Sequence, residues 1–335
     1  MKTLTFSQAL NSGLRAAMEH NDKVVLMGED IGKLGGVFRI TDGLQKDFGA
    51  HRVIDTPLAE SGIVGTAIGL AFRGYRPVVE IQFDGFVYPA FDQIVSQLAK
   101  MHFRSRGNVK LPVTIRIPFG GGIGSPEHHS ESPEAYFAHT AGLRVVAPSN
   151  PQDAYWMLQQ AIADDDPVIF LEPKRRYHQR GEVDTENAPE ATSLYQAKIA
   201  RPGSDLTLIA YGPLVKTAVD TATAAEDEGI DIEVIDLRSL EPVDFETLSA
   251  SVRKTGRVVI AHEAGKFGGM GAELAASLTE RCFDHLDHAP VRVTGFDIPY
   301  PPAKLENHHL PDLDRIMDGV DQAMRRTRAP LGEEA

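Results

Sequence analysis

The stretch "RVIDTPLAESGIVGTAIG" (residues 52–69) reads as a short strand, a turn and the start of a helix, with Pro57 ending the strand. One face of the helix carries glycine at three positions: Gly62, Gly65 and Gly69. Their missing side chains predict close packing along that face. Nucleotide sites use this layout to bind phosphate at backbone N–H groups, but here the turn carries an acid, Glu60, which would repel phosphate. The stretch therefore predicts an α/β unit whose turn holds a carboxylate for another purpose.

Size and composition exclude several classes of protein. The chain has 335 residues, enough for roughly two domains of about 150 residues each. Its 47 acidic and 34 basic residues give a net charge of −13, which argues against nucleic-acid binding and allows a basic protein partner. The single cysteine, Cys282, excludes a disulfide framework and a cysteine-based zinc site. No apolar run reaches the roughly 20 residues of a membrane span, and no signal core is recognisable, so we expect a cytoplasmic protein without a membrane segment.

Short runs rich in Val and Ile alternate with longer helical patterns along most of the chain. Those runs are "KVVLMG", "RPVVEIQF", "PVTIRI", "LRVVAP" and "PVIFLE", followed after a polar interval by "DLTLIAYG", "IDIEVIDL", "RVVIAHE" and "APVRVTGF". Continuous apolar strands that alternate with helices indicate parallel sheets buried on both faces. We therefore predict two parallel-sheet α/β domains, at 1–175 and 204–335, joined by a polar surface linker at 176–203.

Polar groups follow three predicted strands of the first domain, where open α/β sheets bind ligands. They are Glu60, the segment "EIQFDGFVYPAF" (80–91) with Gln82, Phe86 and Tyr88, and a glycine-rich loop that carries His128 and His129. Each has an ordinary structural explanation: Glu60 can be an acid favoured at a helix N-terminus, and the aromatic residues can be core and rim. Adjacent histidines rarely point the same way, so one histidine acting as acid or base on a movable loop is favoured over a two-histidine metal site.

The run Asp164–Asp166 closes a predicted helix, where negative charge opposes the helix dipole. A solvated turn explains it, and so does a hard cation bound by carbonyl and carboxylate oxygens. A phosphate-binding loop with its Lys and Ser/Thr is absent from the sequence, as is the Gly-Asp-Gly segment with a downstream Asn that holds diphosphate and magnesium in thiamine enzymes.

Taken together, the chain resembles the β subunit of the thiamine-diphosphate-dependent 2-oxo acid dehydrogenases over nearly its whole length. The segments that carry the resemblance are "GEDIGKLGGVFRITDGL", "DTPLAESGIVGTAIGLAFRGYRPVVEIQF", "PAFDQIV", "HHSESPEAYFAHTAGLRVVAPSNPQDA", "DDPVIFLEPKRRYH", "EVIDLRSLEPVDFETL" and "KTGRVVIAHEA". "HSESPEAYFAH" and "EPKRRYH" are most similar to the branched-chain members, whereas "TPLAESGI" and "PFGGGIG" are shared with some pyruvate-type subunits. The resemblance implies a transketolase-like pyrimidine-binding domain followed by a transketolase C-terminal-like domain.

The resemblance also implies roles for individual residues. Glu60 matches the glutamate that meets the aminopyrimidine ring of thiamine diphosphate and promotes its imino tautomer, a role that requires an acid shielded from water. Leu58, Gln82 and Phe86 match residues that line that pocket, with Tyr in place of Phe86 in some branched-chain members. His129 matches the active-site histidine on the mobile loop. A potassium site is implied at five residues: Val113, Ala161, Ile162, Asp164 and Asp166, the last of which is frequently Asn in the family.

The implied assembly is a heterotetramer of two α and two β chains, in which the α subunit holds the diphosphate and magnesium. It would decarboxylate 3-methyl-2-oxobutanoate and related 2-oxo acids and pass the acyl group to the lipoyl domain of an acyltransferase, whose basic subunit-binding domain docks on the β C-terminal domain. The alternative substrate is pyruvate. A self-sufficient transketolase-like enzyme is disfavoured by the missing diphosphate signature, and a non-catalytic scaffold is disfavoured because Glu60 and His129 are both present.

Overall fold

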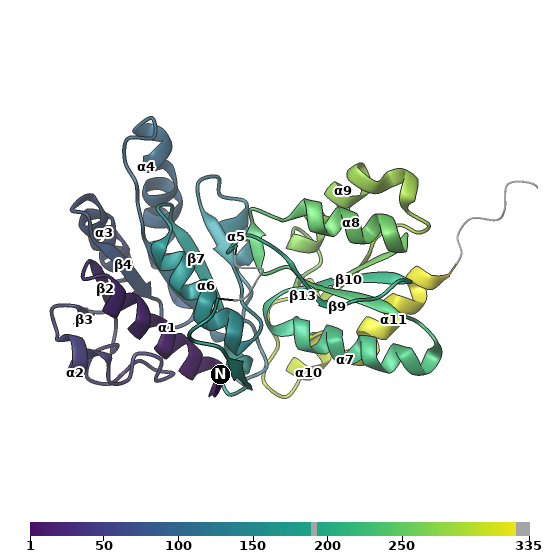
Figure 1. Ribbon diagram of the computed structural model, residues 1–335, viewed down its shortest axis with the longest axis horizontal. Coiled ribbons are helices and arrows are strands. Elements are labelled where there is room, and N and C mark those ends of the chain that lie inside the picture. Colours follow the sequence, from purple (N-terminus) through teal and green to yellow (C-terminus); the bar gives the residue numbers. More distant parts are fainter. Residues whose placement is uncertain (189–192, 326–335) are drawn as a thin grey trace, which may run out of the picture.

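Two α/β lobes lie side by side in the computed structural model, which describes residues 1–188 and 193–325 (Figure 1). The two-domain parallel α/β architecture expected from the sequence is confirmed. Each lobe has a central sheet whose inner strands are almost entirely buried, as their continuous Val and Ile runs require. Among the described residues, no helix combines the length and the apolar composition needed to cross a membrane.

The first lobe is built on a seven-stranded sheet in the order β12-β6-β7-β5-β4-β2-β3. All neighbouring strands are parallel except β12, which pairs antiparallel with β6. The strands are β2 (Val24–Gly28), β3 (Val53–Asp55), β4 (Arg76–Glu80), β5 (Thr114–Phe119), β6 (Arg144–Val146), β7 (Val168–Pro173) and β12 (Ser239–Glu241). The helices of this lobe are α1 (Phe6–His20), α2 (Leu44–Phe48), α3 (Glu60–Phe72), α4 (Ala99–Arg104), α5 (Glu134–Ala138) and α6 (Pro151–Ala163).

Local sequence signals explain where two of these helices begin. The Thr5 side chain and the Gln8 side chain form a capping box at the start of α1. The Asn150 side chain accepts the Asp153 N–H at 3.0 Å and Pro151 occupies the first turn of α6. The helical segment between β4 and β5 is divided between a 3₁₀ helix, η1 (Asp84–Ala90), a π-helical turn, η2 (Gln93–Leu98), and α4. Pro89 lies inside η1 and lacks the N–H that a regular α-helix needs.

The second lobe has a five-stranded sheet in the order β14-β13-β10-β11-β9, with only the edge strand β9 antiparallel. Helices α8 and α9 lie on one side of this sheet and α7 and α11 on the other (Figure 1). Its strands are β9 (Lys198–Arg201), β10 (Leu206–Ala210), β11 (Ile232–Asp236), β13 (Val258–Gly265) and β14 (Val291–Gly295). Its helices are α7 (Val215–Ala225), α8 (Phe245–Thr255), α9 (Met270–Cys282), α10 (Glu306–His309) and α11 (Leu313–Met324), with short 3₁₀ turns between them.

The segment 176–203, expected to be a surface linker, contains two strands. β8 (Arg180–Val183) pairs antiparallel with β1 (Lys2–Thr5), and β9 extends the second sheet. Tyr177 and Val183 are almost fully buried, because these side chains pack into the core of the first lobe. Residues 189–192 of this segment and 326–335 of the second predicted domain lie outside the described residues.

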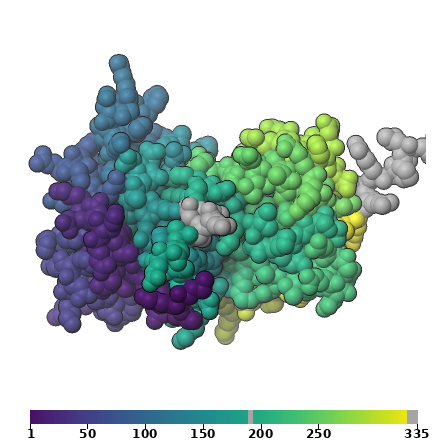
Figure 2. Space-filling view, in the orientation of Figure 1, coloured from purple at the N-terminus to yellow at the C-terminus, as the bar shows by residue number. Residues whose placement is uncertain are grey.

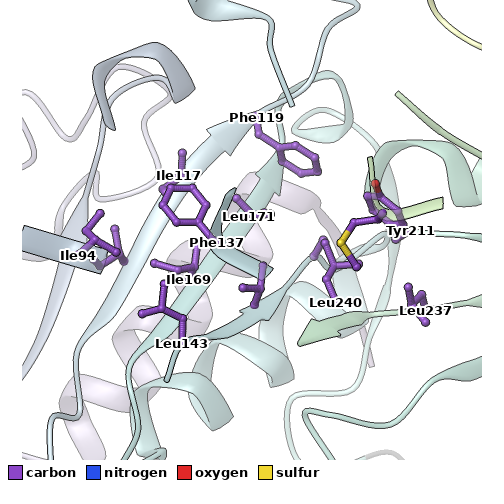
Figure 3. Close-up of a cluster of buried hydrophobic side chains, with 14 of the residues drawn as sticks. Ile94, Ile117, Phe119, Phe137, Leu143, Ile169, Leu171, Tyr211, Leu237 and Leu240 are labelled. Atoms are coloured by element: carbon purple, nitrogen blue, oxygen red, sulfur yellow. The ribbon is translucent and has the colours of Figure 1, made fainter. Parts of the chain in front are cut away.

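The lobes share one hydrophobic core. Figure 3 shows Phe119, Phe137 and Leu171 of the first lobe in the same cluster as Tyr211 and Leu240 from the second half of the chain. The chain also leaves the second sheet after β11 to add β12 to the first sheet, and then returns. The space-filling view accordingly shows the teal and green parts of the chain in broad contact across the middle of the molecule (Figure 2). The two lobes are therefore a single packed structure.

The glycine face of α3 does not pack closely within the chain, contrary to the prediction. A Cβ added at Gly69 would have no heavy atom within 4 Å, and at Gly62 and Gly65 the nearest would be 3.7 and 3.6 Å away. Three neighbouring positions on the opposite face, Ile63, Val64 and Ala67, are the ones buried in the core. The apolar side chains turn inward, so the glycine face is left outward and open.

Candidate active site

The predicted polar groups converge at one edge of the first sheet. β5, β4, β2 and β3 are adjacent and parallel, so their carboxyl ends meet at the same edge. Glu29 follows β2, the β3–α3 turn leads into Glu60, and Gln82 follows β4. The glycine-rich loop that carries His129 follows β5. This is the edge at which open α/β sheets bind ligands.

Glu60 is the first residue of α3, directly after the N-cap Ala59, and only 7% of it is exposed. Among the described residues its carboxylate has no hydrogen bond or ion pair. Glu29 is similarly buried, and its Oε1 has no hydrogen-bond partner. Burial raises the pKa of Glu29, and the neighbouring Glu60 carboxylate raises it further, against the opposing effect of the Ala59 N–H. Two buried carboxyl groups thus face each other with unused hydrogen-bonding capacity.

Gln82 lies against the same pair. Its Nε2 donates weakly to the Glu29 carbonyl at 3.4 Å and to Asp30 Oδ2 at 3.3 Å. Asp30 adopts a left-handed backbone conformation with φ of 58°, which turns the chain sharply after β2. Leu58, by contrast, is 81% exposed at the β3–α3 turn. The structure therefore places Gln82 beside the Glu29 backbone and Asp30, and leaves Leu58 at the rim of the site.

An aromatic cluster holds the histidine. The His129 ring stacks on Phe83 with centroids 4.1 Å apart and meets Phe86 edge-on at 5.1 Å. Its Nδ1 is buried without a hydrogen-bond partner. Burial lowers the pKa of His129, which favours the neutral imidazole near pH 7. His129 can therefore accept a proton from a group brought to this edge.

His128 is exposed, and its ring stands nearly perpendicular to that of His129, with an interplanar angle of 84°. Within residues 1–188 and 193–325, no three His, Cys, Asp or Glu side chains are grouped so that they could hold a metal ion. The role of a single acid–base histidine stays a prediction.

Two buried ionic clusters link the strands and loops that carry the site. On β5, Arg116 donates to Glu80 of β4 at 2.7 Å and to Glu172 of β7 at 2.6 Å. These contacts tie together the carboxyl ends of the three central strands. Asp84 pairs with Lys174 and accepts the Glu131 N–H at 2.9 Å, which joins η1 to the histidine loop. Burial raises the pKa of Asp84 to about 6, against the lowering effect of Lys174.

Comparison with known proteins identifies the family of the chain. The chain matches the family models "Transketolase, pyrimidine binding domain" over residues 2–179 and "Transketolase, C-terminal domain" over residues 195–316. It is 58% identical to a pyruvate dehydrogenase E1 component subunit beta of Leifsonia xyli, covering 97% of this chain and 96% of that protein. It is 54% identical to a 3-methyl-2-oxobutanoate dehydrogenase subunit beta of Mycobacterium tuberculosis, covering 97% and 93%.

The chain belongs to the β-subunit family of the thiamine-diphosphate-dependent 2-oxo acid dehydrogenases. A third relative, a 2-oxoisovalerate dehydrogenase subunit beta of Pseudomonas aeruginosa, is 49% identical over 90% of each chain. Among solved structures, a "split gene transketolase, inactive beta4 tetramer" matches with a TM-score of 0.78 over 97% of this chain and 99% of that one. Its 24% identity supports the shared fold only.

The predicted potassium ligands of this β subunit lie together, but several already have partners. Arg76 donates to the carbonyls of Ile162 (3.1 Å) and Asp164 (2.8 Å), and the Val113 carbonyl accepts from the backbone N–H of Val168. The Asp164 carboxylate accepts from Tyr195. In addition, the Ala161 carbonyl accepts the Asp164 N–H, and Asp166 is paired with Arg144 at 3.2 Å. A carbonyl oxygen has two lone pairs, so one hydrogen bond leaves one free for a cation.

Sequence reasoning missed Glu29 and Phe83 as site residues of this β subunit. Glu29 follows the strand "VVLMG" directly, and the position after a buried parallel strand was the available signal. Phe83 lies between Gln82 and Phe86, both of which were identified, but only the fold shows which aromatic ring stacks on His129.

Proposed function

We propose that this β subunit completes a thiamine diphosphate site together with an α subunit and that Glu60 is its essential acid. The supporting observation is the pair of buried carboxyl groups: Glu29 Oε1 has no hydrogen-bond partner, and the Glu60 carboxylate has none among the described residues. Buried polar groups are rarely left unpaired, so such a pair indicates a polar ligand. An aminopyrimidine ring offers both a ring nitrogen and an amino group, which matches one protonated and one ionised carboxyl.

Bound thiamine diphosphate supplies a thiazolium carbon that becomes the nucleophile toward a 2-oxo acid. In this proposal Glu60 holds a proton against the pyrimidine ring nitrogen. Burial and, secondly, the neighbouring Glu60 carboxylate raise the pKa of Glu29, so Glu29 can hold a proton beside Glu60. Gln82 orients Glu29 through the Glu29 carbonyl and Asp30. Leu58 borders the proposed site at its rim. Phe86 borders it beside the His129 ring.

His129 is proposed as the proton-transfer group when the acyl group passes to the lipoyl disulfide. Its ring is fixed by Phe83 and Phe86, and its unpartnered Nδ1 leaves a buried nitrogen that can hold or release a proton. His129 lies on the loop after β5, next to the carboxyl ends of the strands. It is not part of the Glu29–Glu60 pair. It therefore suits a later step than the one assigned to Glu60.

The proposed substrate is a branched 2-oxo acid such as 3-methyl-2-oxobutanoate, supported by the segments "HSESPEAYFAH" and "EPKRRYH" and by two of the relatives. Pyruvate is the second candidate substrate, because the 58% identical relative is named a pyruvate dehydrogenase subunit. The decisive experiment is reconstitution of this chain with its α subunit and competition between the two substrates. A higher kcat/KM for pyruvate would overturn the branched-chain assignment and leave the family unchanged.

The proposed assembly is a heterotetramer of two α and two β chains, with diphosphate and magnesium held by α. The open glycine face of α3 and the exposed Phe103 of α4, 86% accessible, support burial by a partner. Calorimetry of the isolated chain should therefore detect only weak thiamine diphosphate binding. Tight, magnesium-dependent binding by this chain alone would contradict the shared site.

The second lobe is proposed to dock the basic subunit-binding domain of a lipoyl acyltransferase, since the chain has a net charge of −13. A potassium ion is proposed at Val113, Ala161, Ile162, Asp164 and Asp166, which lie directly before β5, in the last turn of α6 and in the segment that follows α6. Replacing potassium by a large organic cation should lower the Tm of the assembled protein by a few degrees if the site is used. An unchanged Tm would reject the site.

A further inference from the structure

The glycine-rich loop that carries His129 is anchored on the second lobe. Glu306, at the start of α10, accepts the N–H of Gly122 at Oε2 (3.2 Å) and the N–H of Gly124 at Oε1 (3.0 Å). The Tyr300 hydroxyl donates to Glu306 Oε2 at 3.0 Å and also accepts the Gly122 N–H at 3.3 Å. Both oxygens of one carboxylate are thus used to hold a loop that lies more than 180 residues earlier in the sequence.

A second carboxylate continues the same contact. Glu263, near the end of β13, accepts the Gly121 N–H at 3.0 Å and pairs with Arg175 at 2.6 Å. These positions require glycine, because a Cβ on Gly121 would overlap the Tyr300 hydroxyl and a Cβ on Gly120 would lie 2.7 Å from Glu263 Oε2. Two glycines of "PFGGGIG", Gly120 and Gly121, are therefore explained by the close approach of the second lobe.

The backbone conformation makes this part of the loop an anion-binding concavity. Gly120, Gly122 and Gly124 all have positive φ, of 80°, 85° and 71°. Successive N–H groups turned to one side in this way attract a negative charge. Here that charge comes from the protein itself, and hydrogen bonds to an ionised carboxylate are about twice as strong as neutral ones. The second lobe therefore contributes a strong, directional anchor to the loop.

The anchor is connected to His129 through a closed loop. The Gly120 N–H donates to the Glu131 carbonyl at 2.9 Å, which brings the two ends of the loop together. Inside this closure, Ser130 Oγ donates to the Ser125 carbonyl, and the His129 N–H donates to the Pro126 carbonyl at 3.0 Å. A shift of the glycines would consequently move the segment that places His129 on Phe83.

We propose that Glu306, assisted by Tyr300, is a positioning residue for His129, through which the second lobe sets the active-site loop of the first. The inference rests on the proposed role of His129 in acyl transfer to the lipoyl group. Neither Glu306 nor Tyr300 contacts His129, so both act through the loop backbone.

The test uses the full chain assembled with its α subunit and compares Glu306→Gln and Tyr300→Phe with wild type. Glu233→Gln is the matched control, because Glu233 is also a buried carboxylate of the second lobe but pairs with Lys254, away from the loop. Hydrogen exchange of the amides at 121–124 should accelerate about 10- to 100-fold in Glu306→Gln, the equivalent of losing a hydrogen bond to a charged group. Tyr300→Phe should give a smaller increase, and Glu233→Gln none.

The same variants are assayed for lipoyl acylation and for decarboxylation with an artificial electron acceptor. Glu306→Gln should lower lipoyl acylation about tenfold while the artificial-acceptor rate stays within about twofold, and it should add little to His129→Ala in the double variant. Wild-type exchange at 121–124, or equal losses in both assays, would overturn the inference. If His129→Ala itself leaves lipoyl acylation intact, the proposed role of His129 fails, and the exchange result still decides whether Glu306 anchors the loop.

Discussion

Both lobes carry buried acidic residues at the carboxyl ends of parallel strands, but these residues make different contacts in the two lobes. In the first lobe, Glu29 and Glu60 lie at the carboxyl ends of parallel strands with oxygen atoms left unpaired. In the second lobe, Glu263 near the end of β13 is paired with Arg175 and with a loop N–H, and His262 Nε2 accepts the Gly271 N–H. The difference lies in what the carboxylates contact, because Glu263 Oε1 and His262 Nδ1 of the second lobe also lack a hydrogen bond. The carboxyl pair of the first lobe is available to a ligand, whereas Glu263 binds Arg175 and a loop N–H and so holds the two lobes together.

The largest expected effect comes from replacing the acid at the first-lobe site, Glu60, by an amide. Glu60→Gln keeps the size of the side chain but cannot exchange a proton as an acid does. In the assembled enzyme, proton exchange at the thiazolium carbon should slow by about 10²–10⁴-fold, or roughly 3–5 kcal/mol of barrier. Hydrogen–deuterium exchange of the bound cofactor measures this directly.

Glu246→Gln provides the control for Glu60, because Glu246 is also an acid in the first turn of a helix, α8, but is exposed in the second lobe. It should change stability by no more than about 1 kcal/mol, as expected for a helix-dipole contact alone. If Glu60→Gln keeps wild-type cofactor exchange rates, Glu60 is a helix-dipole contact like Glu246. The two lobes then do not differ in the use of their acids.

His129→Ala is expected to have the next largest effect. It should lower lipoyl acylation by up to about 10²-fold, the low end of the usual contribution of a general acid or base. Decarboxylation with an artificial acceptor should fall much less. His128→Ala is the neighbouring control, since the His128 side chain is exposed. Equal losses in both assays would indicate a general role in substrate binding or loop order.

A third prediction concerns a buried acid that joins the two lobes. Glu134 of α5 is fully buried and accepts a hydrogen bond from the Tyr211 hydroxyl at 2.6 Å. Burial raises the pKa of Glu134 from 4.5 to about 7, although the Tyr211 hydrogen bond acts in the opposite direction. The folded protein therefore holds this proton more tightly than the unfolded chain does, and wild type should lose stability as the pH rises from about 4.5 to 7.

The Glu134→Gln variant lacks this titration. Its free energy of unfolding relative to wild type should rise by about 2–3 kcal/mol between pH 5 and pH 8 and change little at higher pH. Urea denaturation at several pH values measures the difference. A difference that stays constant over this range would show that Glu134 is ionised in the folded protein at pH 5.

The smallest effect is expected at the outer surface of the second lobe. If electrostatic attraction brings a basic subunit-binding domain to this acidic chain, raising NaCl from about 50 mM to 500 mM should weaken docking roughly tenfold, because surface charges are screened. Surface plasmon resonance with the isolated subunit-binding domain measures the change. Salt-independent binding would assign the interface to apolar contacts instead.

Sequence reasoning located residues that stand next to strand ends and missed residues that only folding brings near. Glu60 and His129 were recognisable because each follows a predicted strand and belongs to a specific motif. Glu29 was missed although it also follows a strand, because its importance comes from the neighbouring Glu60, a contact across two strands. Glu306 had no local signal, since its partners are 182 and 184 residues away in sequence.

By itself, the sequence determined the two parallel α/β lobes and the edge of the first sheet at which chemistry is expected. It could do so because local patterns of apolar residues, proline and capping side chains predict buried strands and helix starts. Only the tertiary structure decided which side of α3 turns inward, which carboxylates keep unused hydrogen bonds, and which lobe holds the His129 loop. Those outcomes depend on contacts between distant segments, such as Glu306 with Gly122 and Gly124, which no local pattern specifies.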